Sequence, residues 1–318
     1  MTTTEAPAPA ATREALGPTL IRLREQGLDI LVVDADLGKS TSARMFQAAY
    51  PKRFFTLGVA EQNMISVAAG MAALGRTVFA STFAVFAEHA FDQLRMSVSQ
   101  PNLAVKLVAS HGGVSVGEDG ASAQSVEDIA VMSSLVNFRV IVPADVVEAA
   151  AAIEVAARTP GPCYIRTDRP KHAVLYRDGP RFELGRADML RDGADVTHVS
   201  YGLMVERSLD AANLLAGDGI AARVLNMSTI RPLDSDALIR AAREPGAIVV
   251  AEEHLVHSGL GAMAAQALAT RHPVPMEFVG VENRYGESGR SSEVLDALGL
   301  TADHIAAAAR TAISRKSG

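Results

Sequence analysis

The feature that most constrains the fold is a regular alternation between short apolar runs and longer amphipathic segments. In the first half of the chain, apolar runs occupy residues 29–36, 77–82, 103–110, 138–145 and 161–167. Segments with helical periodicity lie between them, at residues 13–26, 61–74, 87–98, 126–134 and 145–158. Strand-like runs separated by helices are typical of βαβ units. The strands of such units form a mostly parallel sheet that helices cover on both faces.

The second half of the chain repeats this alternation. Predicted strands lie at residues 194–202, 222–230 and 247–254, and predicted helices at residues 205–216, 234–243 and 259–268. Residues 171–185 separate the two series and contain proline, glycine and charges of both signs, which is typical of a linker. The sequence therefore predicts two α/β domains with mostly parallel sheets, residues 1–180 and 186–318, with a boundary near residue 180.

Composition excludes several classes of function. With 318 residues the chain is long enough for about two domains. Its 30 Lys and Arg against 36 Asp and Glu argue against a nucleic-acid-binding or polybasic membrane-binding protein. No apolar run reaches the roughly 18 residues of a membrane span. The first twelve residues lack the features of a signal peptide, and we expect them to form a disordered lead-in.

The chain has one cysteine, Cys163, so it cannot form an internal disulfide. We expect Cys163 to be a buried apolar residue, which favours a reducing, cytoplasmic setting. A GDG triplet at 217–219 follows a helical pattern, and the next asparagine, Asn226, comes too soon for a diphosphate–Mg²⁺ motif. The triplet is therefore predicted to be a glycine turn that ends a helix, and no metal ligand is expected in this chain.

The most informative side chains lie between residues 58 and 95. Glu61 begins an otherwise apolar helix. It has two interpretations: a favourable charge at a helix N-terminus, or a carboxyl group that shares a proton with a ligand nitrogen. Steps of three residues place Phe83, Phe86 and His89 near one face of a helix or turn. They form either core packing or an aromatic wall for a flat heterocycle.

A segment with four glycines, SHGGVSVGEDG, follows a predicted strand, at the strand end where open α/β sheets bind ligands. His111 and Asp119 in this segment suit sugar hydroxyls or phosphate, and the alternative is a solvated turn. Three more polar side chains stand at ends of predicted elements: Arg13, Ser40 and Arg166. Arginine is a natural bidentate partner of phosphate, although each residue alone is equally compatible with a surface ion pair.

Several of these segments together resemble the transketolase family of thiamine-diphosphate enzymes. The resemblance lies in GVAEQNMISVAAGMAALG, TFAVFAEHAFDQLR and GVSVGEDGASAQSVEDIA, preceded by ATREAL and followed by TIRPLD and EEHLVHSGLG. It covers the family's pyrimidine-binding and C-terminal domains but not the GDG-containing domain that holds thiamine diphosphate and Mg²⁺. The resemblance therefore implies the C-terminal subunit of a split transketolase. It also implies an N-terminal partner subunit, an α₂β₂-like assembly with active sites at subunit interfaces, and self-association or aggregation without the partner.

The resemblance also implies roles around the cofactor. Glu61 matches the catalytic glutamate that hydrogen-bonds N1′ of the aminopyrimidine and favours the imino tautomer, which takes the proton from thiazolium C2. Phe83 and Phe86 match the aromatic pocket around the pyrimidine. His89 stands where the family often has tyrosine, and Asp36 matches an acid near the cofactor.

Further matches concern the substrate. Four positions match the family's sugar-phosphate clamp: Arg13, Ser40, His111 and Arg166. His111 is also a predicted catalytic residue, and Asp119 matches the acid that recognises the hydroxyl next to the reacting carbon. These matches favour a phosphorylated acceptor and a working enzyme.

One position departs from the family pattern. Transketolases usually read PTHQ after GEDG, whereas this chain reads ASAQ, so Ala123 replaces a histidine that contacts donor hydroxyls. Alanine cannot donate a hydrogen bond. Either the substrate differs from the usual xylulose 5-phosphate, or another group supplies the contact.

We expect an enzyme subunit that moves a two-carbon ketol unit between phosphorylated sugars. One alternative is a specialised ketol or acyl transfer, as in deoxyxylulose-phosphate synthase or the β subunit of a 2-oxo-acid dehydrogenase. Another is a non-catalytic scaffold, which would be expected to lose Glu61 or the two phenylalanines first.

Overall fold

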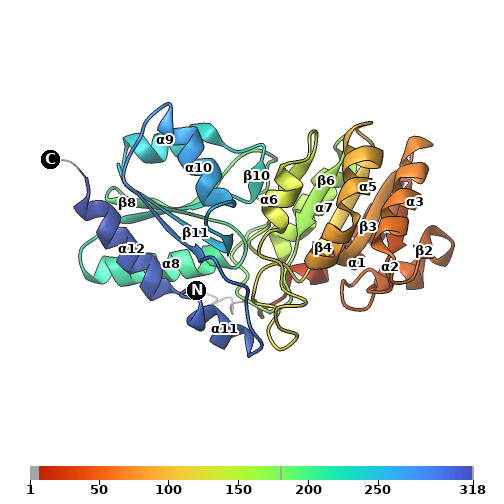
Figure 1. Cartoon of the computed structure of the whole chain (residues 1–318), viewed down its shortest axis with the longest axis horizontal. Helices are drawn as coiled ribbons and strands as arrows, with labels where there is room; N and C mark the ends of the chain where they lie inside the picture. The colour runs from red at the N-terminus through yellow and green to blue at the C-terminus, as the bar shows by residue number, and fades with distance from the viewer. Residues whose placement is uncertain (1–6, 180, 317–318) are drawn as a thin grey trace.

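The computed structural model describes residues 7–179 and 181–316 and contains two α/β domains that lie side by side (Figure 1). One sheet has seven strands in the order β10-β5-β6-β4-β3-β1-β2, and the other has five in the order β12-β11-β8-β9-β7. Within each sheet all the central strands are parallel. The predicted fold class is therefore confirmed.

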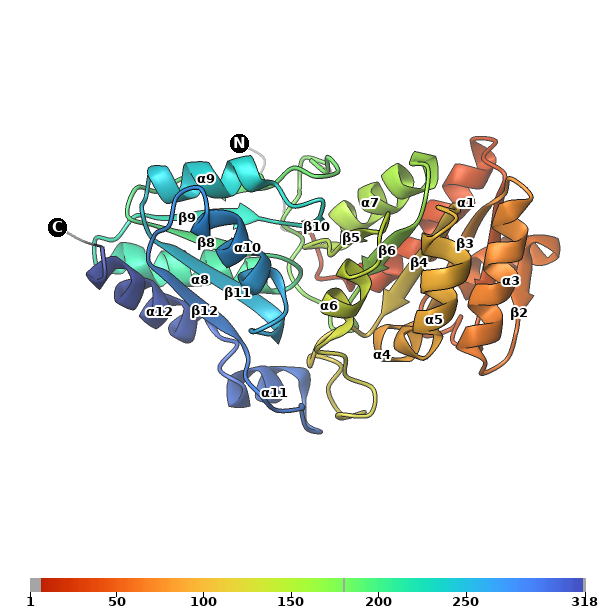
Figure 2. The same cartoon turned by 45° about the horizontal axis from the view of Figure 1, so that its top comes forward.

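The first domain has six strands of its own: β1 (Ile30–Asp34), β2 (Phe54–Thr56), β3 (Thr77–Phe83), β4 (Val105–Ser110), β5 (Arg139–Ile141) and β6 (Cys163–Arg166). Its longer helices are α1 (Leu16–Glu25), α2 (Arg44–Ala49), α3 (Glu61–Ala73), α6 (Asp128–Ser133) and α7 (Val146–Arg158). These helices cover both faces of the sheet (Figures 1 and 2). The strands are almost entirely buried, which is why the sequence reads as apolar runs and not as an alternating pattern.

The C-terminal domain contains β7 (Asp188–Arg191), β8 (Val196–Ser200), β9 (Ala222–Asn226), β11 (Ile248–Leu255) and β12 (Met276–Val281). Its helices are α8 (Met204–Gly217), α9 (Ser235–Arg243), α10 (Leu260–Ala269), α11 (Ser291–Ala297) and α12 (Ala302–Ser314). One apolar cluster runs through both domains and joins side chains such as Met64 and Tyr164 to Tyr201 and Leu260. The two domains are therefore packed on one another through a shared core.

Two predicted elements are divided in the structure. Residues 222–230, predicted as one strand, form β9 and then β10 (Thr229–Arg231), which leaves the second sheet and pairs antiparallel with β5 of the first. Residues 87–98, predicted as one helix, are four short turns: α4 (Ala84–Ala87), η3 (Glu88–Ala90), α5 (Phe91–Gln93) and the π-helical η4 (Leu94–Ser99). In both cases tertiary contacts decide the geometry, because local apolar spacing is compatible with either form.

The prediction of a disordered N-terminal segment is wrong for residues 7–12, which the structure describes. Ala10 forms a β-bridge with His172, and Ala11 is fully buried. The side chain and N–H of Thr12 both donate to the carboxylate of Asp168. Residues 1–6 and the predicted boundary at Pro180 lie outside the described residues. The four-residue 3₁₀ helix η1 (Thr12–Ala15) follows this anchored segment and leads into α1.

Other predictions are confirmed. Cys163 is fully buried in β6. The GDG triplet ends α8, with Gly219 at φ 77°, as predicted for a glycine turn. No helix in the described part of the chain has the length and apolar character needed to cross a membrane.

Candidate functional site

Parallel strands gather the predicted site residues at one edge of the first sheet. Phe83 ends β3, His111 follows β4, and Asp36 follows β1. The carboxyl ends of parallel strands meet at the same edge, where open α/β sheets bind ligands. In Figure 2 the loop that joins β4 to α6 extends from this edge, between α4 and α11. This loop, residues 111–127, is called the glycine-rich loop below.

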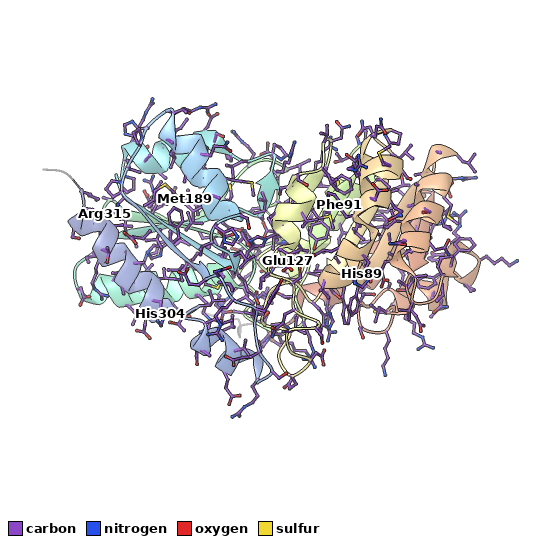
Figure 3. All side chains as sticks on the ribbon, viewed as in Figure 1. His89, Phe91, Glu127, Met189, His304 and Arg315 are labelled. Carbon is purple, nitrogen blue, oxygen red and sulfur yellow. The ribbon has the colours of Figure 1, made fainter. Side chains whose placement is uncertain are left out.

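Glu61 is the first residue of α3 and is only 6% exposed. Thr82 Oγ1 donates to Glu61 Oε1 over 3.3 Å, and His89 Nδ1 lies 3.9 Å from Glu61 Oε2. Gln62 Nε2 donates to the His89 carbonyl, which holds the turn carrying the imidazole against α3. The structure therefore brings Glu61 and His89 together. His89 is labelled in Figure 3 and leaves most of its side chain exposed.

Four rings form a row beside Glu61. The ring of His111 stacks on Phe83 with centroids 3.7 Å apart and planes at 19°. Phe83 and Phe86 are nearly parallel at 5.6 Å and 11°, and Phe86 lies 5.8 Å from His89. The short turns after β3 bring Phe86 and His89 into line with Phe83, and the loop after β4 adds His111. The aromatic wall is thus formed jointly by these turns, the end of β3 and the glycine-rich loop.

His111 is held in an unusual conformation. Its φ is 61°, in the left-handed region that non-glycine residues rarely adopt. Ser110 Oγ lies 2.8 Å from Nδ1 of the ring. Burial, and then the positive charges of Arg13 and Arg169, lower the pKa of His111 to about 3. The imidazole is therefore neutral near pH 7, with its second ring nitrogen available to a ligand.

Two arginines, Arg13 and Arg169, lie near His111, and their charges act on it. Arg13 Nη1 donates to the Ser40 carbonyl over 2.8 Å. Burial, and then the charge of Arg169, lower the pKa of Arg13. Arg169 donates to the Val116 carbonyl and pairs with Glu118 at 2.9 Å. Repulsion between the two guanidinium groups, with a neutral imidazole beside them, is the electrostatic signature of an anion-binding site.

The structure does not bring Arg166 into this group. Its guanidinium is 3% exposed, lies 3.3 Å from Asp128 Oδ1 and donates to the Glu253 carbonyl over 2.9 Å. Burial opposes its charge, but Asp128 and neighbouring groups keep the pKa of Arg166 above its ordinary value. The sequence analysis singled out the arginine inside β6 and not Arg169, whose charge acts on His111. Arg169 follows the end of β6, as His111 follows the end of β4.

The remaining predicted residues lie at the rim of the site. Asp36 is exposed in the loop after β1, at φ 65°. Asp119 is exposed at the tip of the glycine-rich loop, beside Glu118. Ser40 contributes its carbonyl to Arg13. Ala123 is 8% exposed and brings only a methyl group to the loop.

Comparisons with known proteins identify the family of this chain. The family model "Transketolase, pyrimidine binding domain" matches residues 8–173, and "Transketolase, C-terminal domain" matches residues 185–305. The chain is 40% identical over 310 residues to "Transketolase-like protein 2" of Mus musculus, which covers 96% of this chain and 49% of the mouse protein. It therefore spans about half the length of this curated relative.

Two other proteins are matched over nearly the whole of both chains. "6-deoxy-6-sulfo-D-fructose transketolase subunit SqwH" of Clostridium sp. (strain MSTE9) is 38% identical over 305 residues, covering 96% of this chain and 95% of the relative. A solved structure described as "Split gene transketolase, inactive beta4 tetramer" superposes with a TM-score of 0.89 at 42% identity, covering 98% and 100% of the two chains. The chain belongs to the transketolase family, as a relative of the C-terminal portions of split transketolases.

Proposed function

We propose that this chain is the C-terminal subunit of a split, thiamine-diphosphate-dependent transketolase that transfers a two-carbon ketol unit between phosphorylated sugars. The observation that carries the proposal is a continuous arrangement of side chains. A buried carboxyl, Glu61, stands beside a row of rings that ends at His111. The charges of Arg13 and Arg169 act on His111. One end of the arrangement suits a heterocycle, and the other suits an anion.

The residues fit the pyrimidine half of thiamine diphosphate. When bound, this cofactor supplies an electron sink for carbanion chemistry next to a carbonyl. In the proposal, Glu61 holds a proton against N1′ of the aminopyrimidine, and Phe83 and Phe86 support the flat ring. Thr82 orients the Glu61 carboxyl through its 3.3 Å hydrogen bond. We assign the diphosphate and Mg²⁺ to the partner subunit, because the two matching family models are the pyrimidine-binding and C-terminal domains.

The anion end fits a sugar phosphate. Arg13 and Arg169 present charged hydrogen-bond donors. The neutral His111 adds a ring N–H group that can donate to a phosphate oxygen. Arg169 is paired with Glu118, so phosphate binding would replace one anionic partner by another. This arrangement favours Arg169 over Arg166 as the phosphate-binding arginine.

The outer face of α3 supports a partner subunit. Gln62, Ser66 and Gly70 are exposed along this helix, and a Cβ added at Gly70 meets no atom within 4 Å. Val59 and Leu74 at the two ends of α3 are 83% and 81% exposed. Large apolar side chains this exposed, such as Val59 and Leu74, are typical of a protein interface. In Figure 1, α3 lies on the side of the first domain away from the C-terminal domain.

Calorimetric titration of thiamine diphosphate with Mg²⁺ tests the assignment of the cofactor. We expect no binding by this chain alone and binding by the complex with its co-expressed N-terminal subunit. Tight binding by the chain alone would contradict the assignment of the diphosphate to the partner. The same complex is then assayed for ketol transfer from xylulose 5-phosphate to ribose 5-phosphate.

The assay also addresses Ala123. A parallel assay with 6-deoxy-6-sulfo-D-fructose as donor, the sugar in the name of the Clostridium relative, measures donor preference. Turnover of a sugar donor supports the proposal. Decarboxylation of a 2-oxo acid without ketol transfer would instead favour a dehydrogenase-like subunit.

A further inference from the structure

The glycine-rich loop belongs to the first domain, but a carboxylate of the C-terminal domain holds it. Glu253, in β11, is 4% exposed. Its Oε1 accepts the backbone N–H groups of Val114 and Ser115 over 2.6 and 2.5 Å. Those residues follow His111 in the loop. Two converging N–H donors on one carboxylate oxygen form a strong, directional anchor.

The start of this loop needs such an anchor. His111 and Gly113 both have positive φ, 61° and 76°. A non-glycine residue in this region costs free energy, and the conformation persists only where the surroundings impose it. A Cβ added at Gly112 would collide with the Arg166 side chain, and one at Gly113 would collide with Glu253. The two glycines therefore make room for the Arg166–Glu253 pair.

Charge explains why the anchor is a carboxylate. Arg166 Nη2 lies 3.8 Å from Glu253 Oε2, and its Nη1 lies 3.3 Å from Asp128 Oδ1. Tyr164 donates its hydroxyl to the other oxygen of Asp128 over 2.6 Å. All of these side chains are buried. A glutamine at position 253 would turn an NH₂ group either toward the guanidinium or toward the two loop N–H groups, so donors would face donors.

Other contacts extend the anchor along the loop. Gln124 Nε2 donates to the carbonyls of Val114 and Glu287, each over 3.0 Å. The Leu255 N–H donates to the Val126 carbonyl over 2.9 Å. Glu287 and Leu255 are both in the C-terminal domain. Figure 2 shows the loop beside α11, and Figure 3 labels Glu127, near its end, between the two domains.

We propose that Glu253 is a positioning residue for sugar binding: its carboxylate fixes the loop that presents His111 and Asp119 to the substrate. The C-terminal domain thereby controls the substrate subsite without contacting the sugar. This inference rests on the proposed ketol-transfer function for its kinetic readout, but the hold on the loop is a property of the fold and is measured independently.

The test uses the complex of the Glu253→Gln variant with the N-terminal subunit. We expect KM for the sugar phosphate to rise by roughly tenfold, the equivalent of about 1.4 kcal/mol. We expect kcat and the affinity for thiamine diphosphate to change less than about threefold. Hydrogen exchange followed by mass spectrometry should show faster exchange in the peptide that contains Val114 and Ser115, with β11 unchanged. Glu253→Asp keeps the charge and should restore part of the lost affinity.

Glu287→Gln is the matched control. Glu287 lies in the segment that touches the loop, but its carboxylate pairs with Arg284 in solvent. This variant should leave KM and loop exchange unchanged. Unchanged KM and exchange in Glu253→Gln would overturn the proposal. So would a uniform loss of kcat, cofactor affinity and protection throughout β11, because that pattern indicates unfolding. Absence of ketol transfer in the wild-type complex contradicts the proposed function alone, and the exchange measurement still tests the anchor.

Discussion

Individual side chains at the cofactor end of the site differ sharply in how replaceable they are. Glu61 is buried beside Thr82 and His89. Water therefore cannot take over the role of its carboxyl group when Glu61 is replaced. A glutamine keeps the shape but cannot accept and return a proton at N1′. We expect Glu61→Gln to lower kcat in the assembled enzyme by at least about 100-fold, the scale of lost proton-transfer catalysis.

Glu25→Gln, on an exposed position of α1, is the control for this change and should leave kcat unchanged. The melting temperature of both variants should stay close to that of the wild-type chain. If the assembled enzyme with Glu61→Gln kept its normal kcat, this chain would have a scaffolding role and not a catalytic one.

Variants of the two arginines near the end of β6 should have different effects: one should weaken substrate binding, and the other should destabilise the fold. Arg169→Ala removes a partly exposed charge next to Arg13 and should raise KM for the sugar phosphate by roughly 10–100-fold, because a charged hydrogen bond contributes about 1.5–3 kcal/mol. Arg166→Met leaves Asp128 and Glu253 without their cation and should destabilise the chain by about 3–5 kcal/mol. Chemical denaturation and steady-state kinetics of both variants check this division. The reverse assignment of effects would restore Arg166 as the phosphate ligand.

The pair formed by His172 and Asp168 should make stability depend on pH. Burial opposes the charge, but the Asp168 carboxylate 2.8 Å away raises the pKa of His172 from 6.5 to about 9. A folded-state pKa above the unfolded value gives stability that is complete below pH 6.5 and is lost as the pH rises toward 9. Glu88, whose pKa burial raises to about 8, titrates in the same window. The measurement is the free energy of unfolding of the wild-type chain and of His172→Gln from pH 6 to pH 10. The difference between the two gives the contribution of His172, and it should become smaller as the pH rises across this window.

At the scale of elements, the sequence predicted what local pattern controls and missed what distant contacts control. The buried strands β1, β3, β4 and β6 were visible as apolar runs, and so were the long helices α3 and α7. Residues 87–98 were predicted as one helix, because their apolar spacing is helical, but the structure divides this region into short turns. β2, β7 and β12 escaped notice, since short or partly exposed strands leave no continuous apolar run.

The site follows the same division. Glu61, the phenylalanines and His111 were predicted from motifs, and the structure brings them together. The proposed roles of Arg169 and Glu253 were not predicted, because one depends on which way a side chain leaves a strand end and the other on contact between domains.

The glycine-rich loop supplies a prediction at this scale. Gly113 and Gly75 both have positive φ, 76° and 81°, but only at Gly113 would a Cβ strike another side chain, that of Glu253. Gly75→Ala should cost about 1–2 kcal/mol of left-handed strain. Gly113→Ala should cost that amount and about 1–3 kcal/mol more for overpacking. Urea denaturation of the two variants measures the difference, and equal losses would show that the loop yields to the methyl group.

At the scale of the whole molecule, the open face of α3 is the feature that a partner subunit should cover. Gly70→Arg should leave the folded chain at least as stable as before, because a side chain at Gly70 meets open space and arginine is a better helix former than glycine. It should abolish assembly with the N-terminal subunit, and activity with it. Size-exclusion chromatography with light scattering measures the assembly. Ala307→Arg, on the exposed side of α12, is the matched control and should assemble normally.

The passage of β10 into the first sheet links the two domains more closely than a linker would. β5 receives its last neighbour from a strand that lies beyond β9 in the chain. A fragment that stops near residue 180 would leave the backbone N–H and C=O groups of β5 unpaired at an open sheet edge, a known template for aggregation. We therefore expect the first domain to aggregate when it is expressed without the segment that carries β10. Expression of folded protein should need both domains in one chain.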